Sequence, residues 1–271
     1  MVELSFNQTS KLDFYMHHEV HDYLFPEPVL FIHGNLASMR WWEPVLQVFR
    51  NSLPLKNATN PGITLDWRGC GKTAAPQTLE DLKPAKLASD CIALVEKIGL
   101  SKINIVGHSA GGLIALMALQ QKPTLFNKAL LIDPVSPDGL VVTEEKYQAF
   151  NHMRTNRSFC ELVLATTVRG VNTKDPFFQL LVDDAFSAAE LNWEGVPRVL
   201  TDIHFIRRLA EIPHEVLVLH GEFDVTLDIA EAKKIAEGLP RGRFEMLASH
   251  GHSLNVEAPQ KLYGFMQDWF F

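Results

Sequence analysis

Short runs of valine, isoleucine and leucine recur along the chain, each followed by a glycine-rich or polar turn and then by a segment with helical periodicity. Nearly continuous apolar runs are typical of strands buried on both faces of a parallel sheet. With helices predicted at about 85–98, 111–121 and 228–238, strand and helix alternate, which indicates an α/β fold. The predicted strands are VLFIH at 29–33, ITLDW at 63–67, KINIVGH at 102–108, KALLID at 128–133, EVLVLHG at 215–221 and RFEMLAS at 243–249.

Two segments depart from this alternation. Residues 2–24 show a polar and apolar alternation that is typical of an antiparallel hairpin at a sheet edge. Residues 136–212 contain no convincing strand but several helical fragments, which indicates a helical insertion between two strands. We therefore predict one core, formed by residues 1–135 and 213–271, that carries an insertion at 136–212.

Composition and charge narrow the class of protein. The chain of 271 residues is 46% hydrophobic and carries a net charge of -7 without a lysine or arginine stripe, which argues against nucleic-acid and anionic-membrane partners. The N-terminal residues do not resemble a signal peptide and no apolar run reaches bilayer-spanning length, so we expect a cytoplasmic monomer or homodimer. Cys70, Cys91 and Cys160 are far apart, which favours free thiols over disulfides or a zinc site.

The strongest chemical signal is a G-x-S-x-G motif that covers Gly107 to Gly111. It lies between a predicted strand and a predicted helix, the context in which this motif forms a nucleophile elbow. The sharp turn needs glycines where the chain folds back and strains the serine backbone. Ser109 would then be exposed at the carboxyl end of the sheet, above a helix N-terminus that favours developing negative charge. We predict that Ser109 is a nucleophile.

With these features the chain resembles the α/β-hydrolase fold family over nearly its whole length. The resemblance implies a mostly parallel eight-stranded sheet flanked by helices, with the insertion as a cap over the nucleophile. The matching motifs, in the order of the family, are His33-Gly34-Asn35, the D-x-x-G-x-G turn from Asp66 to Gly71, GHSAGG at 107–112, GEFD at 221–224 and GHSLNVEAP at 251–259.

A serine hydroxyl is a weak nucleophile at neutral pH and needs a base to take its proton. His252 follows a predicted strand and precedes a helix expected near Pro259. His250 is a rival, but the glycine directly before His252 matches the family pattern. His108, inside the elbow, is expected to pack or to form a local hydrogen bond. We predict that His252 is the base.

A carboxylate must hold the imidazole in the correct tautomer and stabilise the imidazolium. Asp224 follows a predicted strand directly, and the chain order serine, aspartate, histidine agrees with this fold. Asp133 remains an alternative, because it ends the preceding strand, where some members of the family keep their acid. Glu222 is expected to be a solvated loop residue.

The resemblance also implies an oxyanion hole formed by the backbone N–H groups of Asn35 and Ala110. His33 is expected to be structural. The turn from Asp66 to Gly71 lacks the G-K-[ST] end of a phosphate loop, so it too is expected to be structural.

The insertion is rich in bulky apolar side chains, which predicts an apolar, water-poor pocket. We expect a serine hydrolase that cleaves a small to medium hydrophobic carboxylic ester, thioester or lactone through an acyl-enzyme, with no metal or organic cofactor. The alternatives are a C–C bond hydrolase of ring-cleavage products, a cofactor-free dioxygenase that uses His252 with Asp133, and a ligand receptor without turnover. The candidate pocket residues are Trp41, Asp133, Phe150, Phe178 and Trp193.

Overall fold

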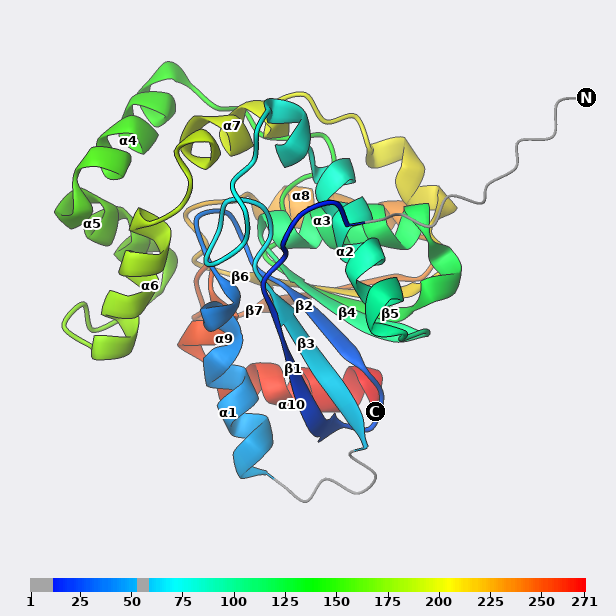
Figure 1. Ribbon diagram of the computed structural model, residues 1–271. Helices are drawn as coiled ribbons and strands as arrows, with labels where there is room; N and C mark the ends of the chain where they lie inside the picture. The colour runs from blue at the N-terminus through cyan, green and yellow to red at the C-terminus, as the bar shows by residue number, and fades with distance from the viewer. Residues whose placement is uncertain (1–11, 53–58) are drawn as a thin grey trace, which may run out of the picture.

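A twisted sheet forms the centre of the molecule (Figure 1). The computed structural model describes residues 12–52 and 59–271. Within these ranges the sheet has seven strands in the order β1-β3-β2-β4-β5-β6-β7, with β1 antiparallel to its neighbour and the other pairs parallel. The strands are β1 (His18–Phe25), β2 (Val29–Ile32), β3 (Asn60–Leu65), β4 (Ile103–His108), β5 (Phe126–Ile132), β6 (Glu215–Gly221) and β7 (Gly242–Leu247).

The predicted α/β fold is confirmed, and each of the six predicted apolar runs overlaps a strand of this sheet. The antiparallel β1 lies at the sheet edge, where the alternating pattern placed the end of a hairpin. The start of that hairpin falls on residues 1–11, outside the described residues. The prediction of eight strands refers to the whole chain, and the described ranges contain seven of them.

Helices cover both faces of the sheet, which explains the continuous apolar strands. In β2, Leu30 and Ile32 belong to one buried cluster, whereas Val29 and Phe31 belong to the other. Successive side chains of a strand point to opposite faces of the sheet, so a strand that is buried on both faces is apolar at nearly every position. The first cluster includes α2 (Pro84–Ile98), α3 (Ala110–Gln121) and α8 (Ile229–Gly238), and the second includes α1 (Glu43–Asn51) and α10 (Pro259–Phe270).

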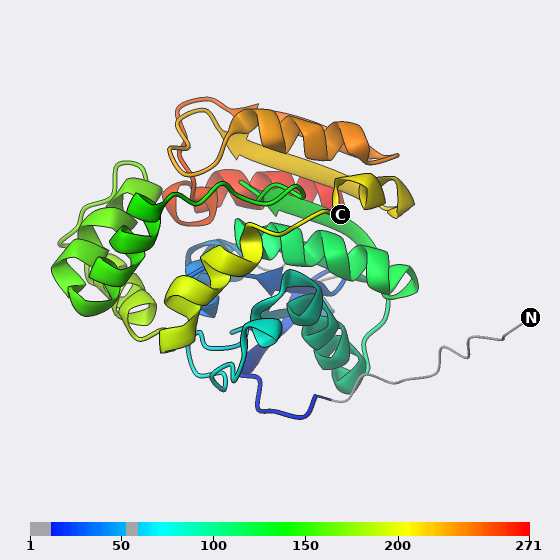
Figure 2. The ribbon, with the colours of Figure 1, turned by 90° about the horizontal axis from the view of Figure 1, so that it is seen from above.

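The chain between β5 and β6 forms a separate group of helices, which we call the insert (residues 136–212). Helices α4 to α6 lie together on one side of the core, and α7 leads back over it (Figures 1 and 2). The insert has its own apolar cluster, which also takes in Leu36, Ala37 and Trp41 from the loop after β2. Its helices are α4 (Glu144–Thr155), α5 (Arg157–Thr167), α6 (Pro176–Phe186), α7 (Glu190–Leu200) and the 3-10 helix η4 (Ile206–Glu211).

Two further observations concern the described residues as a whole. No helix in them combines the length and the apolar character needed to cross a membrane. The cysteines Cys70, Cys91 and Cys160 are free and buried, and burial raises the pKa of each thiol above its ordinary value, so none is a reactive thiolate.

Candidate functional site

Ser109 lies in a sharp turn between β4 and α3. Its backbone has φ 54° and ψ −121°, a strained conformation for a residue with a side chain. Hydrogen bonds from both sides maintain it: the Ser109 N–H donates to the Ile132 carbonyl at 2.9 Å, and its own carbonyl accepts from Gly112 at 2.9 Å and Val135 at 3.1 Å. A side chain at Gly111 would collide with the carbonyl oxygens at the end of β2. The turn therefore depends on close backbone packing against β2.

His252 and Asp224 form a buried hydrogen-bonded pair. The His252 Nδ1 atom lies 2.7 Å from Asp224 Oδ2, and the other oxygen of Asp224 accepts from the N–H groups of Thr226 at 2.6 Å and Leu227 at 3.2 Å. Burial alone would raise the pKa of Asp224, but these hydrogen bonds and the nearby His252 lower it. Asp224 is therefore ionised at neutral pH and holds Nδ1 of His252 protonated, which leaves Nε2 free to accept a proton.

Two side chains hold the His252 loop, and the sequence did not single out one of them, Glu257. His108 Nε2 lies 2.9 Å from the His252 carbonyl oxygen, and since a carbonyl only accepts, this nitrogen carries the proton. The carboxylate of Glu257 accepts from the N–H groups of Gly251 at 2.8 Å and Ser253 at 3.1 Å. Glu257 lies within the GHSLNVEAP motif, but its position in the motif does not indicate that its carboxylate binds backbone N–H groups of the loop.

His108 is buried at the base of the cavity at Ser109. Burial, and then the neighbouring His252, lower its pKa to about 3, so its ring stays neutral. The ring of Trp41 stacks on it with centroids 5.9 Å apart. His108 thus packs and hydrogen-bonds as expected, but its bond is not local, because its partner His252 lies 144 positions further along the chain.

Asp133 lies at the end of β5 but does not hydrogen-bond to His252. Its Oδ1 accepts from the Gly221 N–H at 2.8 Å, and its other oxygen has no hydrogen-bond partner among the described residues. Burial, and then the nearby Asp224, raise the pKa of Asp133 well above its ordinary value. Burial and the charge of Asp224 thus disfavour the ionised form of Asp133, whereas the partners of Asp224 favour its ionised form.

The loop after β2 brings Asn35 to the cavity that Ser109 and Ala110 also line. The Asn35 side chain accepts from the Leu36 N–H at 3.0 Å, and Leu36 has a positive φ of 51°. His33 is buried, and its ring stacks on the Trp67 ring with centroids 5.4 Å apart. These contacts agree with the expected structural role of His33.

The cavity at Ser109 has a volume of about 350 Å³. Trp41 and Phe150 line it, together with residues of α4 and α5 that the sequence did not single out, such as Met153 and Leu164. Among the described residues, Lys146 is the only lysine, arginine, aspartate or glutamate in its lining. Apolar side chains form most of the remaining wall, so the cavity favours an apolar ligand.

Three of the proposed pocket residues do not line this cavity. Asp133 is enclosed behind the site, between β5 and β6. Phe178 and Trp193 are buried in the apolar cluster of the insert, where they hold its helices together. Helical periodicity marks such side chains as buried but does not tell which apolar surface they face.

One group of side chains in the described part of the chain has the spacing of a metal site: Asp133, His220 and Asp224, with potential ligand atoms within 4.8 Å of one another. Asp224 already accepts from His252 at 2.7 Å, and Asp133 accepts from Gly221. A cation here would compete with the His252 pair, so the group fits a hydrogen-bonded acid and base better than a resident metal.

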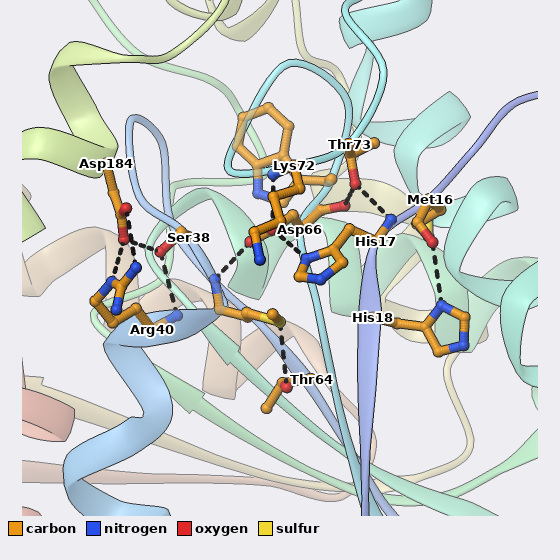
Figure 3. Close-up of polar contacts among 12 residues, drawn as sticks. Met16, His17, His18, Ser38, Arg40, Thr64, Asp66, Lys72, Thr73 and Asp184 are labelled. Carbon is orange, nitrogen blue, oxygen red and sulfur yellow. Dashed lines mark hydrogen bonds and ion pairs between the residues drawn. The ribbon is translucent and has the colours of Figure 1, made fainter.

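The charged turn from Asp66 to Gly71 has the structural role expected of it. Asp66 Oδ1 accepts from the Met39 N–H at 2.8 Å, and Oδ2 accepts from the Lys72 N–H at 3.0 Å and lies 2.9 Å from His17 Nδ1 (Figure 3). Asp66 therefore joins the residue before β1, the loop after β2 and its own turn.

Comparison with known families gives a match over most of the chain. A family model described as "Alpha/beta hydrolase family" matches residues 29–264. A relative from Agrobacterium fabrum named "Putative carbamate hydrolase RutD" is 27% identical over 267 residues, which span 90% of this chain and 94% of the relative.

Solved structures share the fold at low sequence identity. An esterase from Exiguobacterium antarcticum has a TM-score of 0.81 at 20% identity, with 94% of each chain covered. The enol-lactonase from Burkholderia xenovorans has a TM-score of 0.80 at 15% identity, with 93% of this chain and 95% of that chain covered. At these identities the similarity concerns the fold.

Proposed function

Because the chain belongs to the alpha/beta hydrolase family and is a hydrolase, we propose that it cleaves small to medium hydrophobic carboxylic esters, thioesters or lactones through an acyl-enzyme on Ser109. One observation carries the proposal. The strained Ser109 and His252 line one apolar cavity, and His252 Nδ1 lies 2.7 Å from the buried carboxylate of Asp224. A nucleophile, a base and a carboxylate that orients the base are the parts that acyl transfer requires.

The reaction proceeds in two steps. His252 takes the proton of the Ser109 hydroxyl as its oxygen attacks the carbonyl carbon, and then gives that proton to the leaving alcohol or thiol. Water attacks the acyl-enzyme next, with His252 again as base, and the acid is released. Asp224, whose pKa is lowered by its partners although burial opposes this, stabilises the imidazolium in both steps.

The negative oxygen of each tetrahedral intermediate needs N–H donors that are already in place. The backbone N–H groups of Asn35 and Ala110 supply them in this proposal, since both residues line the cavity together with Ser109. Ala110 is the first residue of α3, so the helix dipole adds to the stabilisation of the negative charge.

The insert acts as a cap in this proposal and sets the substrate class. Residues of α4 and α5, including Phe150, Met153 and Leu164, form an apolar wall of the cavity. An apolar wall excludes water and binds acyl or alkyl groups better than charged ones. The name of the relative adds carbamates of similar size as substrates to be tested.

The dioxygenase alternative receives less support, because it needs His252 to work with Asp133. His252 is hydrogen-bonded to Asp224, whereas Asp133 accepts from the Gly221 N–H and has a pKa that burial raises. A raised pKa disfavours the carboxylate form, which is the form that would stabilise a nearby imidazolium.

Replacement of Ser109 by Ala tests the proposal. We expect the wild type to hydrolyse p-nitrophenyl esters from acetate to octanoate with an initial burst, and the variant to lose both burst and turnover, a fall on the order of 10⁶-fold in kcat. A fluorophosphonate probe should label the wild type and not the variant. Wild-type esterase activity in Ser109→Ala, or a panel in which only charged esters react, would refute the proposal. The same panel with p-nitrophenyl carbamates separates ester from carbamate preference.

A further inference from the structure

The loop between β2 and α1 contains the segment that bears the Asn35 N–H. We call residues 34–40 the oxyanion segment. The oxyanion segment follows a core strand, but its side chains Leu36 and Ala37 belong to the apolar cluster of the insert. Trp41, directly after the segment, belongs to the same cluster. The packing of this segment therefore depends on the insert as well as on the sheet.

A carboxylate of the insert binds the far end of the oxyanion segment. Asp184 of α6 accepts from the Ser38 hydroxyl at 2.5 Å and from the Arg40 Nε at 2.7 Å (Figure 3). Ser38 is buried, and its own hydroxyl accepts from the Arg40 N–H at 3.2 Å. One insert side chain thus fixes two residues of the segment and the turn between them.

The core holds the same stretch from the opposite side. The Met39 N–H, between the two residues that Asp184 binds, donates to Asp66 at 2.8 Å (Figure 3). The segment is therefore held between a carboxylate of the core and a carboxylate of the insert. Leu36, with its positive φ of 51°, lies between this anchor and Asn35. A strained residue keeps its conformation only where its surroundings determine it, so loss of one anchor allows the backbone to relax.

We propose that Asp184 is a positioning residue for the reaction, and that its bonds to Ser38 and Arg40 hold the Asn35 N–H where the oxyanion forms. Docking of the insert onto the core then completes the oxyanion hole in addition to covering the pocket. The inference rests on the proposed function, because it gives Asp184 a role only if an oxyanion forms beside Asn35.

The chemistry of the contact separates two contributions. Ser38 itself is buried and its hydrogen bond to Asp184 is shielded from solvent on that side, so this bond sets the geometry of the backbone. The side chain of Arg40 is 42% exposed and borders a polar cavity of about 450 Å³, so salt screens its ion pair with Asp184. We therefore expect loss of Ser38 to reduce activity more than loss of Arg40.

The test measures kcat and KM for p-nitrophenyl butyrate in Asp184→Ala, Asp184→Asn, Ser38→Ala and Arg40→Gln. Misplacement of an oxyanion donor weakens transition-state binding and not ground-state binding, so Asp184→Ala should lose about 10- to 100-fold in kcat while KM stays within about threefold. Asp184→Asn keeps the shape of the side chain and should show a smaller loss of the same kind. The inhibition constant of an alkyl boronic acid, which forms a tetrahedral adduct on serine, should rise in parallel with the loss in kcat/KM.

Asp183 supplies a matched control on the same helix. It pairs with Arg157 of α5, at 2.6 Å from Nη2, and no side-chain hydrogen bond or ion pair joins it to the described residues of the oxyanion segment. Asp183→Asn removes the same charge from α6 and should leave kcat unchanged. Ser38→Ala combined with Asp184→Ala should cost less than the sum of the two single losses in activation free energy, because the two residues share a contact.

Three results would overturn the inference: kcat of Asp184→Ala within about threefold of wild type, an equal loss in Asp183→Asn, or a loss confined to KM and thermal stability. The last result would show that Asp184 only attaches the insert. Failure of the proposed function is recognised separately, because Ser109→Ala would then retain activity. An inactive Ser109→Ala with an unaffected Asp184→Ala would reject the inference and leave the proposed function intact.

Discussion

At the residue scale, His108 links the elbow to the base. Its Nε2–H donates to the His252 carbonyl, and its ring is enclosed between His252 and Trp41. Burial lowers the pKa of His108 from 6.5 in the unfolded chain to about 3 in the folded chain. Between pH 6.5 and about pH 3, His108 is therefore protonated in the unfolded chain and neutral in the folded chain. His108 therefore contributes stability that is complete above pH 6.5 and is lost as the pH falls toward 3.

We predict that His108→Gln, which keeps a side-chain N–H donor, makes the free energy of unfolding less dependent on pH. Urea denaturation at about pH 8 and about pH 5 measures this, with the wild type losing more stability between the two than the variant. Burial also lowers the pKa of His33, which therefore destabilises the fold at low pH in the same way. The free energy of unfolding of the variant should thus still fall between about pH 8 and about pH 5, but by less than that of the wild type. An unchanged difference between the two pH values would contradict a neutral His108.

Asp133 has the opposite effect on the pH dependence of stability. Its pKa is raised in the folded state by burial and by Asp224, so above its ordinary pKa of 3.8 the unfolded chain is ionised while the folded chain keeps the proton. The contribution of Asp133 to stability is complete below pH 3.8 and is lost as the pH rises through the folded pKa. An asparagine at this position would be neutral at every pH, so we predict that Asp133→Asn gains stability relative to wild type between about pH 4 and pH 8. Urea denaturation of both proteins across this range measures the difference, and a constant difference would contradict the raised pKa.

The same variant separates the two candidate acids. Asp133→Asn should keep kcat within about threefold, since Asp133 accepts from the Gly221 N–H and not from His252, whereas Asp224→Asn should lose about 10⁴-fold, because His252 then lacks its carboxylate. Steady-state kinetics at about pH 8 on one ester measure both. A loss only in Asp133→Asn would instead favour the pair of His252 with Asp133.

At the scale of elements, the nucleophile turn depends on the closeness of α3 to β2. A methyl group at Gly111 would meet two carbonyl oxygens of the backbone at Ile32 and His33, and backbone cannot move aside as a flexible side chain can. Relief would shift either α3, which begins beside Ser109, or the loop that carries Asn35. The glycine is needed for this close approach rather than for an unusual φ.

We predict that Gly111→Ala destabilises the fold by about 1–3 kcal/mol, as overpacking of a core does, and lowers kcat as well. Gly264 is the control, because it lies within α10 and a side chain there would meet nothing within 4 Å. Gly264→Ala should increase stability by about 0.5–1 kcal/mol through helix propensity and leave kcat unchanged. Thermal or urea unfolding and ester kinetics on the two variants provide the comparison, and equal effects would reject the packing argument.

Element-scale patterns also explain which parts of the site were predictable. The elbow is predictable because strand, glycines and helix are local in sequence, and the pairing of Asp224 with a histidine follows from the ends of parallel strands meeting at one edge. The contact of Asp184 with Ser38 joins residues 146 positions apart and follows from no local pattern. For the same reason Phe150 and Phe178 looked equivalent, although only Phe150 of the two lines the cavity.

At the scale of the whole molecule, the sequence predicts the core more fully than the insert. The strands are buried on both faces by helices of two clusters, so their apolar runs are continuous and each marks a place in the sheet. The helices of the insert pack on one another and on a loop of the core, and their order in space depends on contacts that hydrophobic periodicity does not specify. The bounds 136 and 212 of the insert therefore remain a prediction, whereas the order of the strands in the sheet is observed.

The shared packing of Leu36, Ala37 and Trp41 with the insert has a consequence for protein engineering. A chimera that receives residues 136–212 from another hydrolase would keep three side chains shaped for the insert it has lost. The transferable unit is discontinuous, and a successful exchange should carry residues 36–41 together with the foreign helices. Recombination in this fold would accordingly succeed more often when its crossovers respect that pairing than when they follow the linear boundaries of the insert.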